Sequence, residues 1–244
     1  MMSEFLEWFS AQFYQTFIFE DRWYIYFAKG LGTTFKITIG ALLIGVVIGV
    51  FIAVVRSAYD SQRVRWHGVG GIVLGLANLV CKLYLTVIRG TPSTVQLLIM
   101  YFIIFGSSQN MLAAAIISFG INSGAYVAEI VRSGIMSIPK GQMEAGRSLG
   151  LNYASTMRFI IIPQAIKNIL PALGNELITL VKETSICTVI GLMDLTKGAM
   201  IVQSRTYAPW MPYLSIALIY LVIVLILTKL LGILEGRLRA SDRR

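Results

Sequence analysis

Charged side chains stand inside apolar stretches of this chain, and a charge is costly there unless it is partnered or wet. Glu129 and Arg132 lie one helical turn apart and are expected to pair on one face. Helical spacing puts Glu176 and Glu183 two turns apart on one face, with Lys182 about 100 degrees away from Glu183. Such groups either line a polar pathway across a membrane or pair within the bundle and fix helix register. The candidate pathway residues of this kind are Glu129, Glu176, Lys182, Glu183, Thr184 and Ser185.

A second polar interruption is Arg89-Gly90-Thr91-Pro92, which breaks a long apolar stretch. Irregular backbone at membrane depth is tolerated only where protein or a water-filled cavity covers it. Arg89 is therefore a candidate element of a pathway or gate. An entry kink with Arg89 extending its charge toward the membrane surface explains the pattern equally well.

Catalytic chemistry finds little support in the sequence. A phosphate-binding loop requires G-x-x-x-x-G-K-[ST], which does not occur, so the chain is not expected to hydrolyse ATP. The single histidine, His67, cannot assemble a multi-histidine metal site or a credible Ser–His–Asp arrangement. The two cysteines, Cys81 and Cys187, are not at ligand spacing and fall inside apolar stretches. No metal, cofactor or enzyme activity of its own is expected.

Composition indicates an integral membrane protein. Hydrophobic residues make up 56% of the 244 residues, and the mean hydropathy is +0.73. The formal charge of +9 resembles that of a nucleic-acid-binding protein. Basic residues in short loops between apolar spans are, however, what membrane orientation requires. We therefore expect a bilayer, and not a nucleic acid, to be the partner of this charge.

Hydropathy and charge predict an all-α protein with five transmembrane helices. Basic clusters at 56–65, 140–167 and 237–244 need the same side, which puts the N-terminus outside and the C-terminus inside. A sixth span at 69–88 is the competing hypothesis, and it would reverse the N-terminus. In the first span, small residues recur every four positions at Ala41, Gly45, Gly49 and Ala53, which favours a close helix interface. The predicted spans are 32–55, 84–106, 112–133, 170–193 and 214–234.

A polar, basic stretch from 138 to 176 interrupts the apolar pattern and predicts a hairpin of two short helices on the cytoplasmic side. Pro139 suits the start of the first helix, and Gly150 permits the left-handed residue that ends it. Asn152 is the expected N-cap of the second helix. That helix should end near Ile162, because Pro163 cannot continue the hydrogen-bond ladder.

From Glu144 to Pro163 the spacing is E-A-G-x3-G-x9-I-x-I-P. It resembles the EAA loop of ABC-importer permease subunits, E-A-A-x3-G-x9-I-x-L-P. Gly146 and Ile162 depart from this pattern, but both keep the side chain small or aliphatic. The flanking segments IRGTP (88–92), NSGAYVAEI (122–130), ALGNE (172–176) and VKETS (181–185) further resemble the permeases that import polar amino acids, and the resemblance covers nearly all of the chain after residue 30.

The resemblance implies the type I permease fold of ABC importers, a dimeric assembly and a place in the bacterial cytoplasmic membrane. Residues 31–244 would form the permease domain, with a coupling loop at about 136–165, and residues 1–30 an extracytoplasmic segment. The implied partners are a second permease chain, identical or different, two cytoplasmic ATPase subunits that bind ATP, an extracytoplasmic binding protein and a polar amino acid. The implied ATPase-docking residues are Glu144, Ala145, Gly146, Arg147, Gly150 and Pro163.

The amino-acid substrate adds a reason for the charges in the spans. An α-amino acid carries one carboxylate and one ammonium, so its pathway would offer both signs together with hydroxyl groups. The alternative hypothesis, an ion-coupled secondary transporter or channel, also places charges in spans. It predicts internal repeats and needs no docking loop, whereas this sequence has no convincing repeat.

Overall fold

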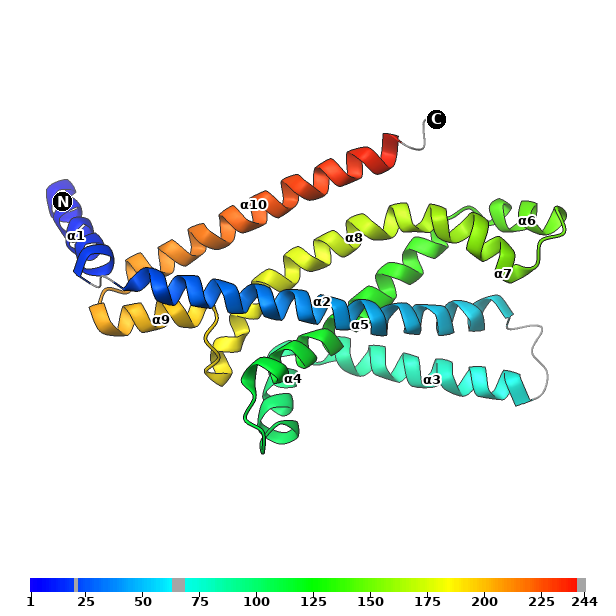
Figure 1. The fold of residues 1–244 in the computed structure, drawn as a ribbon, viewed down its shortest axis with the longest axis horizontal. Helices are drawn as coiled ribbons and strands as arrows, with labels where there is room; N and C mark the ends of the chain where they lie inside the picture. The colour runs from blue at the N-terminus through cyan, green and yellow to red at the C-terminus, as the bar shows by residue number, and fades with distance from the viewer. Residues whose placement is uncertain (20–21, 63–68, 241–244) are drawn as a thin grey trace.

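The computed structural model describes residues 1–19, 22–62 and 69–240, and the regular elements within these ranges are helices (Figure 1). Arg63, Arg65 and His67 lie outside the described residues, as do positions 241–244 of the basic tail. In chain order the elements are α1 (Met2–Tyr14), η1 (Gln15–Phe19), α2 (Trp23–Gln62), α3 (Val69–Gly90), α4 (Ser93–Ile99), η2 (Met100–Ile104), α5 (Met111–Met136), α6 (Lys140–Ser148), α7 (Tyr153–Thr156), η3 (Met157–Ile161), α8 (Ile162–Glu183), η4 (Thr184–Ile190), α9 (Leu195–Thr206) and α10 (Trp210–Ala240).

The centre of the molecule is the pair α2 and α5, which lie against each other along most of their length. The small residues predicted to form an interface lie in this contact. A Cβ atom added at Gly45 would come 2.9 Å from Ser123 Oγ, and one added at Gly49 would come 2.6 Å from the Val127 side chain. Glycine therefore allows the two backbones to approach, and the prediction of a helix interface is confirmed. The predicted first span, 32–55, is the middle of the longer helix α2.

The predicted second span, 84–106, is not one helix. α3 ends at Gly90 and α4 begins at Ser93. Pro92 between them has extended backbone and no N–H to donate, and it disfavours helical conformation in the residue before it, so the hydrogen bonds of α3 cannot continue. The Gln96 amide closes the break by donating to the carbonyl oxygens of Ile88 at 2.8 Å and Thr91 at 3.1 Å. α3 alone has the length and hydropathy that a crossing requires, and the segment from Ser93 to Ile104 is a shorter apolar helix.

The predicted fourth span, 170–193, is the second half of α8 together with η4. After η4 the chain bends by 50° into α9, which packs against α2 and α10. Among the described residues, α2, α3, α5 and α10 are long and apolar enough to cross a membrane, and the bent segment from Tyr153 to Thr206 brings the number to as many as five. The fold is thus the all-helical membrane bundle that the sequence predicts.

The two ends of the bundle differ. At one end, α1 lies beside the end of α9 and the start of α10 (Figure 1), and the rings of Trp8 and Trp210 meet edge to face with their centroids 5.7 Å apart. At the other end, α6 and α7 project beyond α5 and α8 (Figure 1). The helical hairpin and the aromatic N-terminal segment therefore occupy opposite ends of the molecule.

Candidate functional site

The hairpin turn has the geometry expected from its glycine. Gly150 has a φ of +81°, which L side chains rarely adopt. Its N–H donates to the Arg147 carbonyl at 3.0 Å, and the N–H of Leu151 donates to the Gly146 carbonyl at 3.1 Å. These two bonds form a Schellman motif, which satisfies carbonyl groups at the end of α6. The prediction that Gly150 closes the first hairpin helix is confirmed.

The second hairpin helix begins as predicted but does not end where predicted. The Asn152 side chain accepts a hydrogen bond from the Ser155 N–H at 2.9 Å, so Asn152 is the N-cap of α7. The chain then widens into the π-helical turn η3 and continues as α8 without a break. Pro163 therefore stands in the first turn of α8, where a missing N–H is tolerated. The expected stop at Ile162 is wrong because the π turn changes the hydrogen-bond register ahead of the proline.

The structure separates the predicted docking residues into exposed and buried ones. Gly146 is buried, and a Cβ atom there would come 2.6 Å from Thr156 Cγ2 inside the hairpin. Its small size therefore lets α6 pack against α7 and offers no surface to a partner. The exposed residues of the predicted set are Glu144, Ala145, Arg147, Gly150 and Pro163.

Sequence reasoning missed the apolar part of this surface. Leu149 is 79% exposed at the hairpin tip, and Phe159 is 66% exposed on η3. Ile162 and Ile166 add exposed aliphatic surface at the start of α8. Exposed apolar side chains grouped among polar ones are typical of a surface that binds another protein. Their signal in the sequence is weak, because helix-forming apolar residues in a short amphipathic segment are usually buried.

The two helices that flank the hairpin, α5 before it and α8 after it, are held against each other. The Asn168 amide of α8 donates to Ser137 Oγ at the end of α5, at 2.8 Å. Gly134 of α5 lies so close to Ile169 of α8 that an added Cβ atom would come 2.4 Å from that side chain. The hairpin is therefore connected to α5 and α8 together, and its displacement would be passed to both helices.

A layer of polar side chains within the bundle joins α5 to α8 and to α4. Ser123 of α5 donates to Glu176 Oε1 at 2.7 Å. The neighbouring Asn122 donates through Nδ2 to Gln96 Oε1 of α4 at 2.9 Å. Asn122 and Ser123 are buried. The sequence singled out Glu176 by its charge, whereas Gln96, Asn122 and Ser123 were missed because uncharged polar residues are common in membrane helices.

The predicted pair of Glu129 with Arg132 does not form. Glu129 Oε1 accepts from Arg56 of α2 at 3.1 Å and lies 3.8 Å from Arg89 at the end of α3. The Arg89 guanidinium also lies over the Tyr126 ring, 5.7 Å from its centroid. Because α2 lies against α5 along its length, its arginine reaches Glu129. Glu129 therefore pairs across the helix interface and not with Arg132 one turn away in its own helix. Arg89 joins this charged cluster beside the break between α3 and α4.

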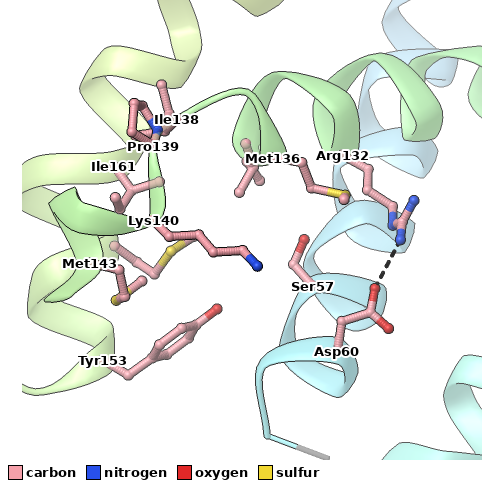
Figure 2. Close-up of a pocket in the computed structure, with 12 residues that line it drawn as sticks. Ser57, Asp60, Arg132, Met136, Ile138, Pro139, Lys140, Met143, Tyr153 and Ile161 are labelled. Atoms are coloured by element: carbon pink, nitrogen blue, oxygen red, sulfur yellow. Dashed lines mark hydrogen bonds and ion pairs between the residues drawn. The ribbon is translucent and has the colours of Figure 1, made fainter.

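Arg132 instead pairs with the end of α2. Its Nη2 atom lies 3.1 Å from Asp60 Oδ2, on the side of the bundle that faces the hairpin (Figure 2). Two ion pairs, Arg56 with Glu129 and Arg132 with Asp60, thus join α2 to α5 near the hairpin end.

The four predicted pathway residues at the end of α8 do not share one environment. Lys182 is exposed, whereas Glu183 and Ser185 are partly buried. Thr184 is fully buried, and its hydroxyl donates to the Val181 carbonyl of its own helix at 2.7 Å. Glu176, Lys182 and Glu183 lie within α8, so the predicted helical spacing holds for them, whereas Thr184 and Ser185 lie in the tighter helix η4. Lys182 and Thr184 therefore do not line the same surface.

Asp194 is a buried acid that sequence reasoning missed. It is fully buried, and its carboxylate accepts from the backbone N–H groups of Thr196 at 3.2 Å and Lys197 at 2.9 Å. It is therefore the N-cap of α9 and holds the bend after η4. A capping acid ahead of a helix-forming run was the available signal. Within the described ranges, no group of three or more His, Cys, Asp or Glu residues could hold a metal ion.

Comparison with known proteins assigns the family. The family described as "Binding-protein-dependent transport system inner membrane component" matches residues 68–240. The arginine transport system permease protein ArtQ of Bacillus subtilis is 38% identical over 88% of this chain and 93% of the relative. The putative glutamine transport system permease protein GlnP of Rickettsia bellii is 37% identical over 89% and 94%.

Comparison with solved structures agrees with this family assignment. The crystal structure of an amino acid ABC transporter with histidines superposes with a TM-score of 0.80 at 45% identity, covering 91% of this chain and 98% of that chain. An inward-facing form of the MetNI methionine ABC transporter gives a TM-score of 0.66 at 22% identity, over 87% of this chain and 94% of that chain, and supports the fold alone. These matches do not support the alternative of an ion-coupled carrier or channel. The chain belongs to the family of inner membrane components of binding-protein-dependent transport systems, the multi-pass permease subunits of ABC importers, which work with a binding protein and with a separate subunit that hydrolyses ATP.

Proposed function

We propose that this permease imports a polar amino acid and that α6 and α7 are its dock for the ATPase. The main support for the docking proposal is the hairpin itself. It projects from the bundle, is connected to α5 and α8, and exposes Glu144, Arg147 and Leu149. The names of the relatives, which mention arginine and glutamine transport, support the substrate class.

The assembly we propose has two permease chains, identical or different, and two ATPase subunits. The ATPase subunits bind ATP and lie on the side of the membrane where the hairpin projects. That side is cytoplasmic, because the basic residues Arg56, Lys140, Arg147 and Arg158 gather there. The aromatic N-terminal segment at the opposite end is extracytoplasmic, where the binding protein delivers substrate. Reporter fusions after residues 10, 60, 150 and 240 are expected to place only the first outside. An internal first fusion would contradict this orientation.

Within the bundle, we propose that the substrate passes the polar layer of Gln96, Asn122, Ser123 and Glu176. This layer offers donors, acceptors and one acid on three helices, α5 and its two neighbours α4 and α8. Glu183 and Ser185 continue it along α8 and η4, and the Arg89–Glu129 cluster lies beside the break in α3. Lys182 is exposed and Thr184 is bonded to its own backbone, so both contribute less directly.

The function is tested with the complex purified through a tag on this chain. Its subunits are identified by mass spectrometry and reconstituted in liposomes with the binding protein. Uptake of radiolabelled arginine, glutamine and histidine is then measured with ATP and with a non-hydrolysable analogue. We expect uptake of at least one of them only with hydrolysable ATP. Uptake that is independent of ATP, or a complex without an ATPase, would refute the proposal.

A further inference from the structure

A pocket of about 240 Å³ lies between the hairpin and the adjacent ends of α2 and α5 (Figure 2). Its polar lining consists of Ser57 and Asp60 from α2, Arg132 from α5, Lys140 from α6 and Tyr153 from α7. Its apolar wall is formed by Ile135, Met136, Ile138, Met143, Met157 and Ile161. The pocket is smaller than the roughly 300 Å³ at which sites for drug-sized ligands begin, so it suits a small group with an apolar neighbour.

The charges in this pocket do not balance. Asp60 is neutralised by its ion pair with Arg132. Lys140 makes no hydrogen bond or ion pair with the described residues, and its ammonium extends toward the space between Ser57 and Tyr153 (Figure 2). Among its described residues, the pocket therefore presents one uncompensated positive charge, that of Lys140, and it is suited to an anion.

We propose that this pocket binds the headgroup phosphate of an anionic phospholipid from the cytoplasmic leaflet. The proposal rests on the orientation proposed above, which puts the hairpin end of α2 and α5 at the inner membrane surface. Basic pockets between membrane helices on that side bind anionic headgroups, and the methionine and isoleucine wall accepts the adjoining glycerol and acyl carbons. Lys140 therefore recognises lipid, and not the ATPase. A lipid bound there contacts the hairpin and both core helices at once, and it stabilises one hairpin position.

The test uses the purified complex in nanodiscs of phosphatidylcholine with increasing phosphatidylglycerol, and native mass spectrometry of the lipids that remain bound after release. We expect Lys140→Met to weaken phosphatidylglycerol retention about fivefold, the effect of losing one lysine near an anionic surface. Lys140→Arg should retain the lipid. Arg158→Met is the matched control, because it removes the same charge from an exposed residue of η3 beside the hairpin but lies outside the pocket. It should leave retention unchanged.

Three outcomes would overturn the proposal. Retention could be the same in Lys140→Met as in the unsubstituted complex. Arg158→Met could lower it equally, which would mean general attraction to a basic surface. Inorganic phosphate could displace the lipid completely, which would assign the site to free phosphate. Lipid retention does not depend on ATP or substrate, so a failure of the transport proposal is visible separately in the uptake assay.

Discussion

Gly150→Val should weaken the association of the ATPase with the permease, or its stimulation, through the hairpin turn alone. Gly150 has a φ of +81°, and a Cβ atom added there meets nothing within 4 Å. The substitution therefore costs only backbone strain, which for a residue held in the left-handed region is about 1 to 3 kcal/mol. At about 2 kcal/mol, the population of the native turn falls roughly thirtyfold relative to competing turns. The Schellman bonds that hold α6 against α7 are lost in those competing turns.

The assay is ATP hydrolysis by the reconstituted complex, with and without substrate-loaded binding protein, beside the amount of ATPase that co-purifies. We expect Gly150→Val to lower co-purification or stimulated hydrolysis while the permease still inserts. Gly141→Val is the matched control, because this glycine is also exposed on α6, has no atom within 4 Å of an added Cβ and lacks a positive φ. Gly150→Asn should have a smaller effect, since asparagine tolerates the left-handed region. Unchanged coupling in Gly150→Val would refute the role of the hairpin as a rigid dock.

Substitutions at three further positions test the bundle. Gly49→Leu should destabilise the permease by about 1 to 3 kcal/mol, because the larger side chain overpacks against Val127. The unfolding temperature in detergent should therefore fall. An unchanged temperature would contradict the close contact. Asp194→Ala should cost about 0.5 to 2 kcal/mol by the same measurement, whereas Asp194→Asn, which keeps a capping oxygen, should cost less; equal losses would argue against the cap. Glu176→Gln keeps an acceptor for Ser123, so assembly should persist while the rate or selectivity of uptake changes. Normal uptake of every amino acid would remove Glu176 from the pathway.

Much of the hairpin could be predicted because its signals are local. A glycine that ends α6 and an asparagine that begins α7 act through bonds to residues within a few positions, and both predictions hold. The course of the chain at Pro163 could not be predicted in the same way. A π turn depends on how η3 packs beneath α6, and no residue type requires it.

The pairing of the charged residues could not be predicted from local spacing. Glu129 and Arg132 have ideal spacing for a pair within α5, yet each pairs with a residue of α2. The partners lie more than 70 positions away in sequence, so one-turn spacing contains no information about them. The small residues that recur every four positions in α2 did predict that this helix has a close neighbour. They did not predict that the neighbour is α5, or that Arg56 and Asp60 of α2 would therefore reach Glu129 and Arg132.

The connection between the hairpin and the polar layer depends on α8, which contains Pro171 between the two. A proline inside a helix removes one backbone hydrogen bond and is a common place for bending. α5 contacts α8 on both sides of this point: Ser137 accepts from Asn168 on the hairpin side, and Ser123 donates to Glu176 on the other. A bend at Pro171 would move one half of α8 away from α5 and break at least one of these bonds. While both bonds persist, the hairpin and the Glu176 layer must therefore move as one body, so a displacement at the dock reaches the polar layer directly.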